Sequence, residues 1–178
     1  MALDLEMNQP SRSIIQIGVA VGDISTGNIK ESKSLIINPH EAINPYIEDL
    51  TGINQEMVDA GMSLQDAYVQ IRDMHAASGS FINPLTWGGG DAEELRQQLK
   101  NSEFYSEDSW CFGRRWIDVK TLFVSWRLAS GDPIQGGLAK SMTKVGLAFQ
   151  GRKHDAEHDA INTFYMFNKM LKIIKRKQ

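Results

Sequence analysis

Alternating and continuous apolar runs predict three strands at the beginning of the chain. Apolar and acidic residues alternate around Asp4 and Glu6, so a strand there would place both carboxylates on the same face. Residues 14–21 are almost continuously apolar, which is typical of a strand buried on both faces. A turn-forming segment at 22–28 separates this run from another apolar run that ends at 34–39. We therefore predict three antiparallel strands, with the Asp4 strand near the centre of the sheet.

Helical periodicity replaces this pattern after the third strand. Apolar residues recur at helical spacing over 43–58, and Gly52 and Asn54 interrupt them, which predicts two short helices around a bend. Ser63 can cap a longer helix that ends near Gly79. The buried stripe of this helix is expected to comprise Leu64, Ala67, Tyr68, Ile71 and Met74.

The second half of the chain alternates further strands with helices. The apolar pattern of residues 80–87 predicts a fourth strand, although Pro84 is unfavourable in its middle. Consecutive glycines then lead to Asp91 at the beginning of a helix. The remaining expected elements are a strand around 116–119 and helices through 122–126, over 138–145 and from near His154 to Ile173. Strands followed by helices and strands in alternation predict an α/β fold with a mixed sheet.

A small set of residues spread along the chain could form one polar site. Carboxylates at the end of a central strand are costly to bury unless they are paired, protonated or bound to a cation. Carboxylates combined with an imidazole are therefore typical of a paired-metal hydrolase. Simpler interpretations exist for parts of the set, because the first two acids could be solvated and the third could serve only as a helix N-cap. The candidate site residues are Asp4, Glu6, Asp91, His154 and Asp159.

The spacing of His154 and Asp159 constrains where the last helix begins. Five residues of α-helix rotate by about 140°, so the two side chains cannot face one ligand if both lie well inside the helix. We therefore predict that His154 precedes the helix or lies in its first turn, whereas Asp159 points rigidly toward the sheet. That arrangement suits a fixed metal ligand beside a mobile base.

Composition bounds the class of protein. The chain has 178 residues, of which 42% are hydrophobic, so we expect a single domain over residues 1–178. A formal charge of -3 and a pI near 5.8 are not those of a strongly basic nucleic-acid binder. A metal-dependent phosphodiesterase, however, concentrates acids at its centre and needs basic residues only at the rim. The candidate rim residues are Arg114, Arg115, Arg152, Lys153, Lys169, Lys172, Lys175, Arg176 and Lys177.

Cysteine content and hydropathy bear on the compartment. The single cysteine, Cys111, cannot form an internal disulfide or a paired-cysteine metal site, which favours a reducing compartment. No early apolar stretch is typical of a signal peptide, and no segment has the length that spans a bilayer. We therefore expect a soluble cytoplasmic protein without membrane contact.

The candidate residues lie in three short motifs: Asp4-Leu5-Glu6, Trp87-Gly88-Gly89-Gly90-Asp91 and Gly151-Arg152-Lys153-His154-Asp155-Ala156-Glu157-His158-Asp159-Ala160. These motifs, with further segments across nearly the whole chain, resemble those of the DEDDh, or DnaQ-like, 3′–5′ exonucleases. Leu50-Thr51-Gly52-Ile53 is similar to the family segment beside the terminal nucleotide. Gly137-Leu138-Ala139-Lys140 and Val145-Gly146-Leu147-Ala148-Phe149 are similar to the helix that leads into the third motif. Within the family the chain looks most like the branch of the histone-mRNA exonucleases and the sporulation-inhibitor-type exonucleases.

The resemblance implies a fold, a chemistry and a set of roles. The fold would be ribonuclease H-like, with a mixed five-stranded sheet of three antiparallel strands followed by parallel strands and flanking helices. Two divalent cations, Mg²⁺ or Mn²⁺, would be held by Asp4, Glu6, Asp91 and Asp159, and His154 would be the general base. The substrate would be the 3′ end of single-stranded DNA or RNA, cleaved to nucleoside 5′-monophosphates. The residues that contact this end would be Met7, Leu50 and Thr51.

Two other functions remain open from the sequence. A domain of this type could be a catalytically silent module for binding nucleic acid or for interaction with other molecules. His154 to His158 also spells the inverted zinc-protease pattern, but that pattern needs an acidic ligand downstream, and no Asp or Glu follows Asp159. Release of mononucleotides would distinguish the enzyme from the silent module.

Overall fold

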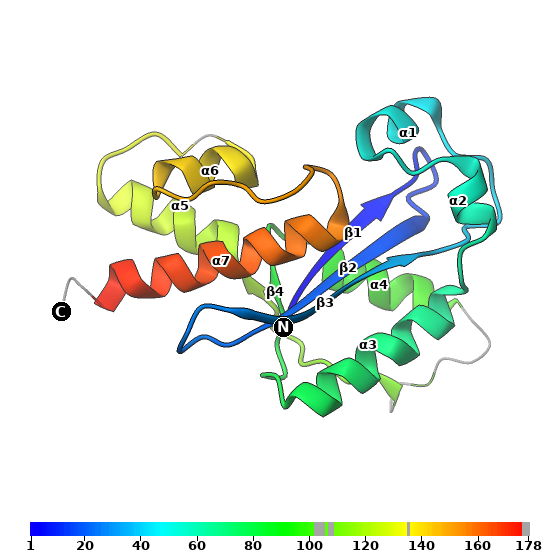
Figure 1. The fold of residues 1–178 in the computed structure, drawn as a ribbon, viewed down its shortest axis with the longest axis horizontal. Helices are drawn as coiled ribbons and strands as arrows, with labels where there is room; N and C mark the ends of the chain where they lie inside the picture. Colours follow the sequence, from blue (N-terminus) through cyan, green and yellow to red (C-terminus); the bar gives the residue numbers. More distant parts are fainter. Residues whose placement is uncertain (102–105, 107–108, 135, 176–178) are drawn as a thin grey trace.

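The computed structural model describes residues 1–101, 106, 109–134 and 136–175 of the chain. Its centre is a mixed five-stranded sheet with the strand order β3-β2-β1-β4-β5 (Figure 1). Strands β1 to β3 are antiparallel, and β4 and β5 continue the sheet in parallel with β1. This confirms the predicted α/β fold. The strands are β1 (Ala2–Met7), β2 (Ile14–Gly22), β3 (Ile29–Ile36), β4 (Leu85–Thr86) and β5 (Ile117–Asp118).

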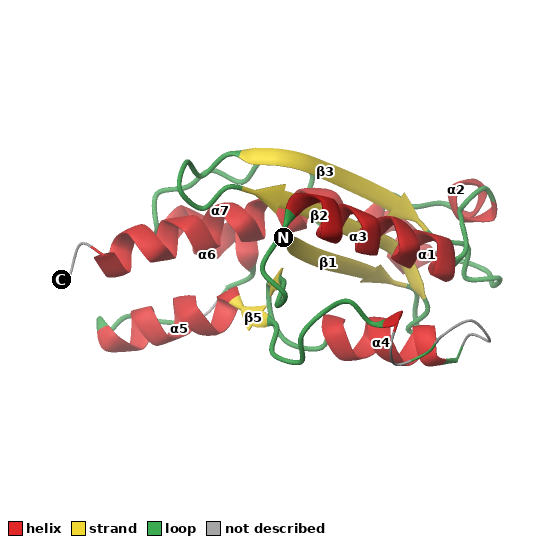
Figure 2. Ribbon diagram, turned by 90° about the horizontal axis from the view of Figure 1, so that it is seen from below, coloured by secondary structure: helices red, strands yellow, loops and turns green. Residues whose placement is uncertain are grey.

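Helices cover both faces of this sheet (Figure 2). Helices α3 and α4 pack on one face, and α5, α6 and α7 pack on the other. The two short helices α1 and α2 follow β3 and lie on either side of a bend, as predicted. The helices are α1 (Pro45–Thr51), α2 (Gln55–Asp59), α3 (Leu64–Ser78), α4 (Asp91–Lys100), α5 (Val119–Ala129), α6 (Leu138–Lys144) and α7 (Ala156–Lys175).

The alternation of side chains along β1 separates the core from the polar site. Leu3 and Leu5 are buried in the core beneath α3 and α4. Ala2 is buried in the second core, which α5, α6 and α7 form with the other face of the sheet. Because successive side chains of a strand point to opposite faces, Asp4 and Glu6 lie on the α7 face, as the sequence predicts.

The beginning of α7 packs tightly against β2. A β-carbon at Gly18 would lie 1.8 Å from the carbonyl carbon of Ala156, so only glycine permits this close approach. The buried Gln16 side chain also accepts a hydrogen bond from the Ala156 N–H at 3.0 Å. The first N–H groups of a helix need such partners, so β2 caps the helix that carries Asp159.

The fourth strand is much shorter than residues 80–87 would allow. Only Leu85 and Thr86 pair with their neighbours, and the predicted eight-residue strand is therefore wrong at its beginning. Pro84 lacks the N–H group that a strand ladder needs. Phe81 and Ile82, whose apolar side chains suggested a strand, are more than half exposed instead of packed in the sheet.

The predicted ends of the later elements differ only slightly from those observed. The strand expected at 116–119 is restricted to Ile117–Asp118, since Val119 already begins α5, and α6 ends at Lys144. Helix α7 begins at Ala156, two residues after His154, which confirms that the histidine precedes the helix. None of the helices within the described residues is both long and apolar enough to cross a membrane.

Candidate active site

A pocket of about 560 Å³ lies between β1, the segment from the end of β4 to the beginning of α4, α6 and the segment before α7. Segments that are far apart in the sequence meet there because β1 lies between β2 and β4, and α7 crosses the same face. The predicted site residues all line this pocket. They are Asp4, Glu6, Asp91, His154 and Asp159.

Two different local structures, a strand and the beginning of a helix, present Asp4, Glu6 and Asp91. Asp4 and Glu6 alternate along β1, and Asp91 is the first residue of α4, directly after Gly90 with its positive φ of 119°. Asp91 lies at the helix terminus, yet Gly90 occupies the N-cap position and makes no side-chain cap. The interpretation of Asp91 as a simple N-cap is therefore wrong, and Asp91 lines the pocket instead.

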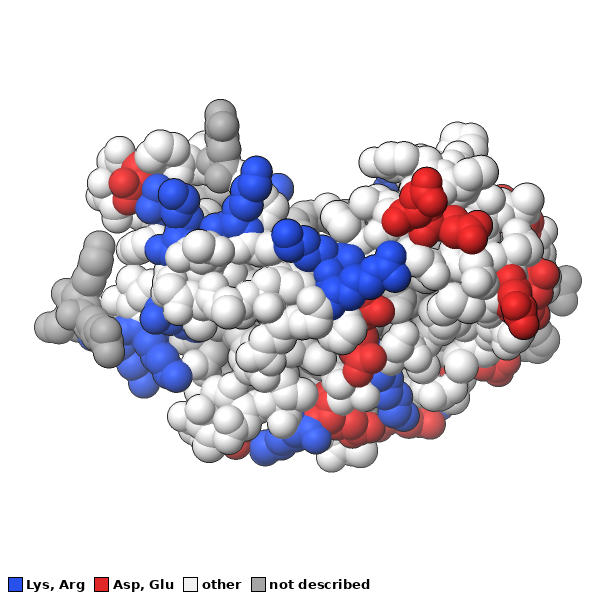
Figure 3. Space-filling view, turned by 45° about the horizontal axis from the view of Figure 1, so that its top comes forward, with Lys and Arg blue, Asp and Glu red and all other residues white. Residues whose placement is uncertain are grey.

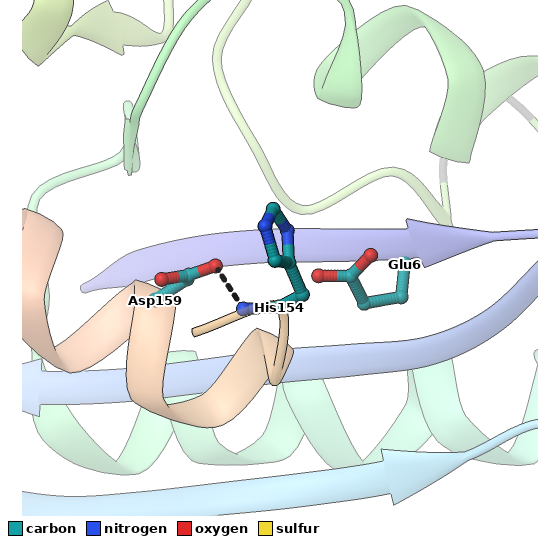
Figure 4. A group of neighbouring side chains, drawn as sticks. All are labelled: Glu6, His154 and Asp159. Atoms are coloured by element: carbon teal, nitrogen blue, oxygen red, sulfur yellow. Dashed lines mark hydrogen bonds between the residues drawn. The ribbon is translucent and has the colours of Figure 1, made fainter. Parts of the chain in front are cut away.

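Glu6, His154 and Asp159 form the tightest part of the site. One potential ligand atom from each of these side chains lies within 4.8 Å of the others. Figure 4 shows the imidazole between the two carboxylates, one from β1 and one from α7. A histidine before the helix and an aspartate inside it therefore lie in one cluster.

The backbone around His154 is held in an unusual conformation. Its φ is 58°, in the left-handed region that few residues other than glycine adopt. The His154 N–H donates a hydrogen bond to Asp159 Oδ2 at 3.3 Å (Figure 4). The carboxylate of Asp159 thus orients the segment that carries the imidazole as well as facing the pocket.

Asn162 anchors the beginning of the same segment. Its fully buried amide donates hydrogen bonds to the carbonyl oxygens of Gln150 and His158, at 2.8 Å and 2.7 Å. Its Oδ1 accepts a hydrogen bond from the Gln150 N–H at 3.0 Å. Asn162 therefore joins α7 to the chain just before His154. An asparagine within an apolar helix has no distinctive spacing, so Asn162 could not be predicted as a functional residue from the sequence.

Burial and mutual repulsion raise the pKa of the clustered carboxyl groups. Burial, followed by the charges of Asp159, Asp155 and Asp91, raises the pKa of Glu6 to about 7. Burial, with the charge of Asp118, raises the pKa of Asp91 to about 7. The pKa of Asp4 is raised well above its usual value, first by burial and then by the charge of Asp91.

Asp159 differs because it has a compensating partner. Burial raises its pKa to about 6, and the hydrogen bond from the His154 N–H acts in the opposite direction. Carboxylates forced together in this way favour either protonation or a bound cation. Their oxygen donors fit hard divalent ions such as Mg²⁺ or Mn²⁺, and the residues present thus suit the cations that the resemblance implies.

Asp118 supports the loop that leads to Asp91. It ends β5 and caps α5, where its Oδ1 accepts hydrogen bonds from the N–H groups of Lys120 and Thr121. The same oxygen accepts a hydrogen bond from the Gly88 N–H at 3.0 Å. Sequence reasoning missed this role, since the contact between residues 88 and 118 depends on the pairing of β4 with β5.

Cationic side chains also line the pocket, and the sequence analysis predicted only part of them. Lys153 was a candidate rim residue and does line the pocket, but Lys120 and Lys140 were not identified. Arg152 lies nearby, against Gly52 at the end of α1, where a β-carbon would approach its guanidinium within 1.8 Å. Of the other candidates, Arg176 and Lys177 fall outside the described residues.

The residues expected to contact the 3′ end are not part of the pocket lining. Among the described residues, those that line the pocket do not include Met7, Leu50 or Thr51. Thr51 is 3% exposed, and its hydroxyl donates a hydrogen bond to the Ile47 carbonyl and accepts one from the Ile53 N–H. Leu50 and Met7 are half-buried and retain some accessible surface.

Comparison with known proteins identifies the class. The family model RNase_T, described as Exonuclease, matches residues 1–167, so the chain belongs to this exonuclease family. The convergence of its acidic residues and histidine agrees with the DEDDh type of the family.

Individual relatives agree with this assignment. The 3′-5′ exonuclease Snipper of Drosophila melanogaster is 27% identical over 179 residues, which cover 89% of this chain and 61% of that protein. The ERI1 exoribonuclease 2 of Mus musculus is 25% identical over 183 residues, which cover 91% of this chain and 26% of that protein. The chain thus spans less than two thirds of the length of either relative.

A solved structure shares the fold. The nuclease domain of 3′hExo, described as a DEDDh family member bound to rAMP, superposes with a TM-score of 0.79 at 20% identity. The match covers 97% of this chain and 90% of that domain.

Proposed function

We propose that this chain is a metal-dependent 3′–5′ exonuclease that removes nucleoside 5′-monophosphates from single-stranded RNA or DNA. The observation that carries the proposal is the meeting of Asp4, Glu6, Asp91, His154 and Asp159 in one pocket. Membership of the exonuclease family and the similarity to named 3′–5′ exonucleases support it. We also propose that residues 1–178 form one exonuclease domain.

The carboxylates would hold the cations, and the histidine would handle the proton. We assign two divalent ions, Mg²⁺ or Mn²⁺, to Asp4, Glu6, Asp91 and Asp159. When bound, such ions supply Lewis-acid stabilisation of the charge that develops on the phosphate and on the leaving oxygen. His154 would accept the proton of the water that attacks the last phosphodiester, because its exposed imidazole stands beside Glu6 and Asp159.

The end of the substrate would lie between β1 and the end of α1. The backbone beside Met7 and the apolar side chain of Leu50 would contact the terminal nucleotide. An apolar contact of this kind accepts any base, so cleavage would not depend on the identity of the terminal base. The hydroxyl of Thr51 is already in two hydrogen bonds. Thr51 would therefore contribute through its backbone and by holding the turn after Leu50.

Release of labelled mononucleotides tests the function. A single strand labelled at its 3′ end is incubated with the protein and Mg²⁺ or Mn²⁺, and the products are separated by size. We expect labelled nucleoside 5′-monophosphate first, and no release in EDTA. Asp4→Asn should abolish release, whereas Asp49→Asn on the exposed face of α1 should not.

Other outcomes would support other functions. Binding of the strand without release, in every metal tried, would contradict the exonuclease and support a silent nucleic-acid-binding module. Parallel digestion of matched RNA and DNA strands, single and double, measures which substrate is preferred. A cytoplasmic location remains a prediction from the sequence.

A further inference from the structure

Besides Lys153, two further lysines line the active-site pocket without pairing with its acids. Lys120 at the beginning of α5 and Lys140 on α6 line the same pocket as Asp4 and Asp91. Within the described residues, neither ammonium group forms an ion pair with a carboxylate. Both side chains are exposed to solvent. They are therefore free to receive an anion beside the site.

Lys144 extends this positive surface away from the pocket. It follows Lys140 by four residues on α6, so both side chains lie on the same face of the helix. The four residues advance by about 6 Å along the axis. Lys144 is exposed and, among the described residues, also lacks an ion pair. We call Lys120, Lys140 and Lys144 the lysine wall.

The opposite side of the site has the opposite charge. Helices α1 and α2 carry exposed acids, Glu48 and Asp49 on the first and Glu56 and Asp59 on the second. Figure 3 shows Lys and Arg side chains gathered on the half of this face that holds α6 and the segment before α7, and acids gathered toward α1 and α2. A polyanion that leaves the pocket is thus attracted to one side and repelled from the other.

We propose that the lysine wall binds the phosphates of the nucleic-acid strand on the 5′ side of the cleaved bond, so that the strand leaves the site over α6. This inference rests on the proposed exonuclease function. It adds the path of the strand and the residues that hold it. In a chain whose net charge is -3, attraction for a long polyanion has to come from such a local concentration of cations.

The wall acts mainly on affinity for long substrates. Each lysine that neutralises a phosphate releases condensed counterions, which makes binding weaken as salt increases. For single strands the slope of log K against log salt changes by about 0.7 for each phosphate contact. Loss of two phosphate contacts should thus make the slope of log K against log salt shallower by about 1.4.

A charge-neutral double variant tests the wall. We would measure, by fluorescence anisotropy in EDTA, the binding of a single strand of about 15 nucleotides to wild type and to Lys140→Gln/Lys144→Gln. Lys30→Gln/Lys33→Gln on β3 is the matched control, since it removes the same charge at a different place. Initial rates on the same strand and on a dinucleotide are compared with Mg²⁺ present.

We expect the wall variant to bind the long strand about tenfold more weakly at about 50 mM salt, with the shallower salt dependence given above. Its rate on the long strand should fall by a larger factor than its rate on the dinucleotide. The control should bind as wild type does. Unchanged affinity and salt dependence of the wall variant, or an equal loss in the control, would overturn the proposal.

Failure of the wall and failure of the enzyme can be told apart. If wild type releases no nucleotides from either substrate, the exonuclease proposal fails, while the anisotropy measurement still decides whether the wall binds the strand. If wild type cleaves both substrates and the wall variant keeps the affinity of wild type, only the strand path is wrong.

Discussion

Asp118 accepts a hydrogen bond from the backbone N–H of Gly88 at 3.0 Å. This contact joins the end of β5 to the loop after β4, which continues through Gly90 to Asp91. Asp118, which lies outside the three motifs, thus supports the loop that carries Asp91. Together with burial, its charge also raises the pKa of Asp91.

The first prediction concerns this support. Asp118→Ala should lower the exonuclease rate by about 10- to 100-fold, as loss of a residue that orients a metal ligand commonly does. It should also lower the free energy of unfolding by about 1 kcal/mol, because Asp118 caps α5. The rate under saturating substrate and a thermal melt measure the two effects.

A control separates positioning from stability. Ser63 caps α3 through a hydrogen bond from the Asp66 N–H, away from the pocket. Ser63→Ala should reduce stability by a similar amount and leave the rate unchanged. Equal loss of rate in both variants would contradict a positioning role for Asp118.

The second prediction concerns the imidazole. His154→Ala should lower the rate by about 10² to 10⁴, since it removes the proposed general base. The thermal melt should change little because the side chain is exposed. His40 is the matched control, because it is also exposed and also has a positive φ, 55° against 58°. His40→Ala should leave the rate unchanged, and a rate loss of similar size in it would contradict the assignment of the loss to the imidazole of His154.

The third prediction concerns pH and the crowded carboxyl groups. Burial raises the pKa of Glu6 and Asp91 to about 7 and that of Asp159 to about 6. Such groups bind protons more tightly in the folded than in the unfolded protein, so folding stability decreases as pH rises from their usual values to the raised ones. In EDTA, the melting temperature should fall between about pH 5 and pH 7.

Metal ions should reverse this trend. Mn²⁺ or Mg²⁺ binds the ionised carboxylates, so the gain in melting temperature should be larger at the higher pH. Asp4→Asn/Glu6→Gln should flatten the pH dependence in EDTA and reduce the gain from metal. The same type of change at Asp49 and Glu48 on α1 should do neither. A melting temperature that rises with pH in EDTA would contradict the pKa assignments.

The fourth prediction concerns the anchor of the histidine segment. Asn162→Ala removes three part-buried hydrogen bonds and leaves the backbone of Gln150 without its partner, which should cost about 2 to 3 kcal/mol of unfolding free energy. The rate should fall as well, because the chain before His154 loses its attachment to α7. Thermal or chemical unfolding and initial rates measure both.

Asn168 on the same helix is the control. Its amide is also buried, but it donates to the Ile24 carbonyl at the distant hairpin. Asn168→Ala should lower stability without changing the rate of the folded protein. If neither variant lowers the rate, the segment before α7 does not depend on Asn162 for its catalytic position.

The elements of this fold were largely predictable because their signals are local. The buried run of β2 and the alternation in β1 each specify which faces of a strand are apolar, so these strands and the shared face of Asp4 and Glu6 could be predicted. Residues 80–87 were the exception. Their apolar side chains suggested a strand, yet Pro84 and the exposed Phe81 restrict the ladder to two residues.

The sequence alone determined that the chain has the acids and the histidine of the candidate site. Through local periodicity, it also determined which face of its strand or helix each of them occupies. Only the tertiary structure decided which of those faces meet. The order of the strands brings Asp118 beside Gly88, and the packing of α5 and α6 on the sheet brings Lys120 and Lys140 into the same pocket as Asp4. Such contacts arise from the packing of distant segments, and no local pattern encodes them, because each depends on the path of the whole chain between its partners.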